Sequence, residues 1–126
     1  MDKNKIFIIL GVLFVLSLNF FLKPYLERRE VIKIVRTVLT CWQKGDLLSV
    51  YNFWKDPKKS PPIYDLISYI IRDKSFSRKG GIPSARISVT LEFAPGNTSP
   101  SGKEWIFELE KTDLGWQIIA FHLLNQ

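Results

Sequence analysis

The chain has 126 residues, 46% of them hydrophobic and 24% charged, and a formal net charge of +6 at pH 7. About 100 residues follow an apolar N-terminal stretch, which is enough for one domain with a modest core and too few for two. One cysteine excludes an internal disulfide framework and a cysteine-based zinc site, and one histidine excludes a two-histidine metal centre. We therefore expect no cofactor.

The apolar stretch covers residues 6–22, which contain no charged side chain and lie between Lys5 and Lys23. Fourteen of its 17 residues are Ile, Leu, Val or Phe, and their summed insertion free energy is about −4 to −8 kcal/mol. A helix of this length spans roughly 25 Å, the lower limit for a hydrocarbon core of about 30 Å, and flanking lysines extend its reach. The sequence predicts a short tail and transmembrane anchor at 1–23.

A cleaved signal peptide is the alternative interpretation of this stretch. Cleavage requires small residues after the apolar region. The stretch instead ends in Phe20, Phe21 and Leu22, so a retained anchor is favoured.

Two charge patterns bear on the orientation of the anchor, and they predict opposite orientations. More basic residues follow the stretch than precede it, which favours a cytoplasmic domain. The very short basic tail with Lys3 and Lys5 instead resembles a signal anchor, which exports the segment after it. We favour a single-pass protein with its domain on the exported side, periplasmic or extracellular, and keep the cytoplasmic side as the alternative.

Helical periodicity follows the anchor. Apolar residues recur every three to four positions from Tyr25 to Lys44, and Pro24 predicts a bend between anchor and helix. Gly45 is typical of a residue just after a helix, and Asp46 of the N-cap of a short helix over Leu47–Trp54.

A third helix is predicted from Ile63 to about Lys74, after a proline-rich loop. Ser60 fits its N-cap and Pro61 its first turn. Its apolar residues keep the helical period.

Three strands then follow, because the apolar period changes to two. Alternating side chains predict strands over Arg86–Ala94 and Lys103–Lys111, and a tight turn over Thr112–Gly115 leads into a last strand, Trp116–Leu124. That strand is apolar on both faces, which indicates a central or covered position. The fold class is therefore α+β: residues 24–126 form a small domain of three helices packed on a curved antiparallel sheet of three or four strands.

Residues 31–54 and 102–124 resemble the nuclear transport factor 2-like superfamily. The first segment is similar to its long helix, Gly-Asp break and short helix, and the second to its closing hairpin with a Gly-Trp pair. The resemblance implies a cystatin-like cone, shared by isomerase- or dehydratase-like enzymes and by non-catalytic anchoring or assembly domains. No catalytic motif of the enzymes matches here, so no catalytic residue is carried over.

Three groups of residues are candidates for binding. The candidates for a small-ligand cleft are Tyr51, Trp54, Tyr64, Tyr69 and His122. The candidates for a partner interface are Trp105, Phe107, Trp116 and Ile118, and those for contact with lipid headgroups are Lys23, Arg28, Arg29 and Lys33.

His122 has two interpretations. With strict alternation it shares a face with Trp116, Ile118 and Ala120, and the simpler interpretation is a hydrogen-bonded histidine near a sheet edge. An acid–base role needs a carboxylate partner such as Glu104 or Asp65.

These observations favour a non-catalytic accessory or assembly subunit of a membrane complex, whose domain contacts other subunits or a second copy of itself. The alternative is a small-ligand binder or an isomerase/dehydratase-type enzyme that uses the cone interior. Nucleic acid is not an expected partner, because the basic residues form no continuous stripe.

Overall fold

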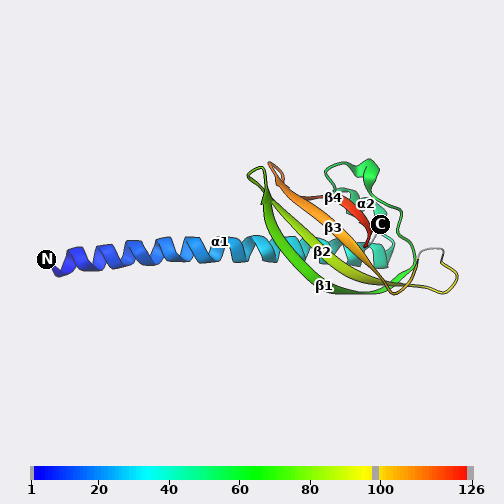
Figure 1. Cartoon of the computed structure of the whole chain (residues 1–126), viewed down its shortest axis with the longest axis horizontal. Coiled ribbons are helices and arrows are strands. Elements are labelled where there is room, and N and C mark those ends of the chain that lie inside the picture. The colour runs from blue at the N-terminus through cyan, green and yellow to red at the C-terminus, as the bar shows by residue number, and fades with distance from the viewer. Residues whose placement is uncertain (1, 98–99, 125–126) are drawn as a thin grey trace. The chain divides into compact units, whose positions relative to one another are not determined.

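The computed structural model describes residues 2–97 and 100–124, except for the side chains at positions 21 and 23. The chain divides into two compact units, Met1–Glu30 and Val31–Gln126. One long helix, α1 (Lys3–Lys44), contributes to both units, and the remaining elements belong to the second (Figure 1).

The first unit consists of α1 up to Glu30 and includes the apolar stretch. Pro24, where the sequence predicts a bend between anchor and helix, lies inside α1. A proline removes one hydrogen bond from a helix interior and costs about 3 kcal/mol. Leu22 and Leu26, one on each side, favour a helix, and α1 continues through the proline.

The second unit begins with the last third of α1, which ends where predicted. Gly45 has φ +76°, the left-handed conformation that follows many helices. Asp46 caps α2 (Leu47–Tyr51), because its carboxylate accepts hydrogen bonds from the backbone N–H of Ser49 at 3.2 Å and from the Ser49 hydroxyl at 2.6 Å. The predicted cap is confirmed, and α2 ends three residues earlier than expected. A short 3₁₀ helix, η1 (Pro57–Lys59), follows.

The prediction of a third helix is wrong, because the described residues contain two α-helices rather than three. Ser60 is extended after η1, and most of the predicted helix instead belongs to strand β1 (Leu66–Lys79). Asp65, at φ +57°, turns the chain into this strand, and its carbonyl accepts a hydrogen bond from the Ala94 N–H at 2.9 Å. Pairing with the next strand overrides the helical apolar pattern.

The other three strands confirm the prediction from alternation. They are β2 (Ile82–Phe93), β3 (Lys103–Thr112) and β4 (Gly115–Leu123). All neighbours are antiparallel and follow the order β1-β2-β3-β4, a simple meander that curves across the second unit (Figure 1). The fold is therefore α+β with a four-stranded sheet.

The core lies between α1 and one face of this sheet, here called the inner face. Val35, Val38, Leu39 and Trp42 of α1 are buried there. The sheet residues buried with them are Ala85, Ile87, Val89, Leu91, Phe93, Phe107, Leu109, Trp116 and Ile118. Alternate residues point to the outer face, which is mostly polar, as is usual for an antiparallel sheet with one solvated side.

The outer edge of β4 is covered by the segment after α2. Ile118 donates its N–H to the Phe53 carbonyl at 2.8 Å and accepts a hydrogen bond from the Lys55 N–H at 3.0 Å. Trp54 and Ile118 thus form an isolated parallel bridge. β4 is therefore last in the sheet rather than central, and this segment covers part of its outer edge.

Candidate functional surfaces

The apolar stretch is one candidate surface. Thirteen large apolar side chains between positions 6 and 22 are each at least 40% exposed. α1 is long and apolar enough to cross a membrane, and none of its most apolar 18-residue window is buried within the protein. A core helix would be mostly buried, so this segment requires a covering that the described residues do not supply.

Three of the four predicted interface residues lie in the core of the domain. Phe107 and Ile118 are fully buried and Trp116 nearly so, and all three are on the inner face. Trp105 is partly buried and stacks on Phe121, with ring centroids 4.8 Å apart. The apolar sheet face therefore packs against α1 and is not available to a partner.

The predicted ligand-binding residues do not converge. Trp54 is buried beside β4, whereas Tyr51 and Tyr64 are exposed on α2 and on the loop before β1. Tyr69 lies at the inner face, where its hydroxyl is 3.4 Å from the Thr40 hydroxyl. His122 lies on the opposite, outer face.

The position of His122 follows from a bulge that the sequence does not reveal. The pairing of β3 with β4 shifts between Glu108 and Leu109. Residues directly opposite each other share a face, so Ile118 lies inward opposite Leu109, and His122 lies outward opposite Ile106. Strict alternation fails because the bulge adds one residue to β4 at Ile119. His122 consequently does not share a face with Trp116 and Ile118.

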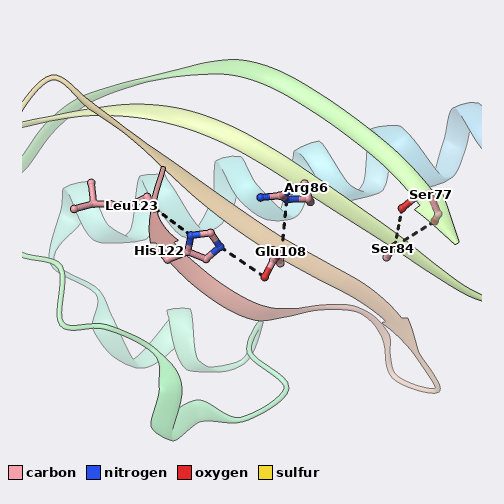
Figure 2. Close-up of polar contacts among 6 residues, drawn as sticks. All are labelled: Ser77, Ser84, Arg86, Glu108, His122 and Leu123. Atoms are coloured by element: carbon pink, nitrogen blue, oxygen red, sulfur yellow. Dashed lines mark hydrogen bonds and ion pairs between the residues drawn. The ribbon is translucent and has the colours of Figure 1, made fainter. Parts of the chain in front are cut away.

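A polar cluster occupies the centre of the outer face (Figure 2). Glu108 lies between two basic groups: its Oε1 is 3.6 Å from Arg86 Nε, and its Oε2 is 3.7 Å from His122 Nε2. The other ring nitrogen of His122, Nδ1, is 3.2 Å from the Leu123 carbonyl. The contact with Glu108 becomes an ion pair when the imidazole is protonated.

The partner carboxylate of His122 is thus Glu108, and neither Glu104 nor Asp65 takes that place. Glu104 instead accepts a hydrogen bond from the Ser88 hydroxyl at 3.2 Å, and Asp65 lies in the turn before β1. The alternation of β3 in the sequence predicts that Glu108 points away from the apolar face. Only the pairing of β3 with β4 shows that His122 lies beside it. The cluster is exposed enough to bind a partner group, since the side chains of Arg86, Glu108 and His122 are 53%, 26% and 37% exposed.

The predicted lipid-contact residues all belong to α1. Arg28, Arg29 and Lys33 are exposed, and the side chain of Lys23 lies outside the described part of the chain. These residues follow the apolar stretch within eleven positions along the sequence.

Comparisons with protein-family models, curated proteins and solved structures find no match to this chain.

Proposed function

We propose that this chain is a single-pass membrane-anchored accessory or assembly subunit. Residues 6–22 cross the bilayer, and the second unit binds other subunits of a membrane complex or a second copy of itself. The observation that supports the proposal most directly is the exposed apolar segment of α1, since burying thirteen large apolar side chains in lipid removes an otherwise unfavourable surface.

Retention of the anchor is supported by the continuity of α1. The helix runs from the apolar stretch to Lys44, and its last turns, with Leu39 and Trp42, belong to the domain core. We further propose that the domain lies on the exported side of the membrane.

The outer face of the sheet is the surface that we propose for the protein partner. Unlike the inner face, it is not packed against α1. Its centre combines the charges of Arg86 and Glu108 with the donor and acceptor groups of His122, around the buried Ile106. Such a mixture of polar groups suits a specific, oriented contact.

The test is purification of the full chain in mild detergent, with a photo-crosslinking amino acid at position 86. The matched control carries the crosslinker at Lys58, an exposed residue of η1. We expect membrane proteins or a second copy to co-purify, and to crosslink from position 86 but not from 58. Recovery of an uncrosslinked monomer from native membranes would contradict the proposal, as would complete release of the chain by alkaline extraction.

A second proposal is the binding of a small molecule inside the domain. It is favoured by the buried indole N–H groups of Trp42, Trp54, Trp105 and Trp116, which have no hydrogen-bond acceptor among the described residues. Unpaired buried donors are uncommon in proteins. A ligand with an acceptor group would change the tryptophan emission and raise the midpoint of thermal unfolding. Lack of both effects across a set of apolar carbonyl compounds would count against it.

The nuclear transport factor 2-like resemblance also stays a proposal. The long helix followed by a curved antiparallel meander supports it, whereas the strand in place of a third helix departs from the expectation.

A further inference from the structure

The outer face of the sheet is ordered in rows that cross its four strands. Residues that pair across neighbouring strands lie level with one another and share a face. The central row contains two members of the polar cluster in Figure 2. From β1 to β4 this row runs through Ser75, Arg86, Glu108 and Ala120.

β2 presents hydrogen-bond donors on this face, and none of its acidic residues lies between them. Arg72 of β1 adds to these donors, because its Nε donates to the Thr90 hydroxyl at 3.2 Å. The donors of β2, in successive rows, are Ser84, Arg86, Ser88 and Thr90.

β3 presents acceptors in the same rows, and neither of its lysines lies on this face. Lys103 and Lys111 are opposite Leu91 and Trp116, which are buried on the inner side. β4 adds one titratable side chain, His122. The acceptors of β3, each level with a donor of β2, are Glu104, Glu108 and Glu110.

Contacts within one copy leave donors and acceptors for another molecule. Arg86 reaches Glu108 through Nε at 3.6 Å, and the two side chains are 53% and 26% exposed. A guanidinium carries several N–H groups, and a carboxylate accepts several hydrogen bonds. Each side chain can therefore serve a neighbour in its own sheet and a group above the sheet.

The arrangement is self-complementary under a two-fold rotation about an axis that is parallel to the strands and lies between β2 and β3. This rotation exchanges β2 with β3 and β1 with β4, and it keeps every row level. Arg86 of one copy then faces Glu108 of the other, and the contact occurs twice, as in any isologous interface. In the same way, Thr90 faces Glu104 and Ser84 faces Glu110.

The margins of the face match as well. Ile70 of β1 lies in the row of Thr90 and Glu104, and Leu124 donates its backbone N–H to the Glu104 carbonyl at 2.9 Å. The rotation brings these two apolar residues, 53% and 39% exposed, to the same place. A partner with a uniformly acidic or basic surface would match only one of the two central strands, whereas a second copy matches both.

We propose that the outer faces of two copies of this chain pack against each other about this axis. Arg86 of each copy pairs with Glu108 of the other at the centre of the contact. The inference rests on the proposed function, because it names the partner of the face that we assign to protein binding.

The test measures energy transfer between full chains in mild detergent. Donor or acceptor dye is attached at Lys58→Cys, an exposed position of η1, in a Cys41→Ser background. We expect transfer that falls on dilution. Arg86→Glu and Glu108→Arg should each raise the dissociation constant by about tenfold or more, because each turns two attractive contacts into repulsive ones. The matched control, Arg36→Glu, reverses an exposed charge on α1 and should leave the constant unchanged.

Mixing the two variants distinguishes this pairing from a general loss of folding. Arg86→Glu chains and Glu108→Arg chains carry opposite charges at the facing positions, so the mixture should recover the transfer that each variant alone has lost. Absence of transfer in the parent would overturn the proposal. Transfer that survives both substitutions, or a mixture that recovers nothing, would do so too.

Crosslinking tests the axis itself. Packed sheets lie about 10 Å apart, and three strand spacings cover about 14 Å. Ser75→Cys in one copy should therefore react with Ala120→Cys in another through a short bis-maleimide, again with Cys41→Ser. Two copies that both carry Ser75→Cys should react much less, and equal yields would refute this axis.

The photo-crosslinking from position 86 separates this inference from the proposed function. A chain that is monomeric by energy transfer but crosslinks to a different membrane protein would refute the second copy and keep the partner surface. A chain that crosslinks to nothing from position 86 would refute both.

Discussion

Replacement of Phe107 with alanine tests the packing of the domain core. The ring is fully buried, and its centroid lies 5.8 Å from that of Trp42 and 4.6 Å from that of Phe121. Truncating a buried phenylalanine costs about 3–5 kcal/mol through lost apolar burial and the cavity left behind. Each lost aromatic pair accounts for about 0.5–1.5 kcal/mol of the effect. A domain of this size is stable by about 5–15 kcal/mol, so this one change should remove a large share of its stability.

Tryptophan emission during urea unfolding in detergent measures the effect directly. All four tryptophans, at positions 42, 54, 105 and 116, belong to the second unit, so the emission follows the domain and not the anchor. With a slope of about 1.5 kcal/mol per M, the Phe107→Ala midpoint should fall by about 2 M or more. The control, Leu114→Ala, removes an exposed side chain and should stay within about 0.5 kcal/mol of the parent. Equal midpoints for the two variants would refute this description of the core.

Three further predictions concern single positions. The hydroxyl and backbone N–H of Ser49 hold the pKa of Asp46 below its ordinary value. The Asp46 carboxylate therefore stabilises the fold at any pH above the unfolded-state pKa of about 3.9. This contribution is lost as the pH falls through the lower, folded-state pKa. The parent should therefore lose more stability than Asp46→Asn on acidification, measured as urea midpoints at neutral and acidic pH. Gly115 has φ +98°, so Gly115→Ala should cost more than about 1 kcal/mol in the same assay, and a neutral effect would contradict the turn geometry. Glu108→Gln weakens a partly exposed ion pair with Arg86 and should change the unfolding free energy by no more than about 1 kcal/mol, so a much larger loss would mean that the outer-face cluster is structural.

The sequence predicted the elements whose patterns are local. Alternation in Ile87, Val89 and Leu91 identified β2 and its buried face, because a two-residue period has no helical equivalent. The break at Gly45 and the cap at Asp46 likewise depend on neighbouring residues only.

Features that depend on distant partners could not be predicted in this way. The segment 63–74 has apolar residues at helical spacing, yet Leu66, Tyr69 and Ile71 pair with β2, a contact that no local window contains. The bulge at Ile119 is equally invisible in the sequence, and it decides which face His122 occupies. Of the outer-face cluster, the sequence singled out His122 alone, and the strand register was needed to find Glu108 and Arg86 beside it.

The two edges of the sheet also differ in how readily they admit another strand. On the β4 edge, the backbone N–H and carbonyl of Ile118 are hydrogen-bonded to Phe53 and Lys55. On the opposite edge, none of the described strands pairs with the outer side of β1. There the register with β2 shifts between Ile71 and Lys74, and the intervening Arg72 and Asp73 are exposed charges. Irregularities and charges of this kind obstruct edge-to-edge polymerisation. Such an interruption guards the domain against growth into fibrils through its exposed strand.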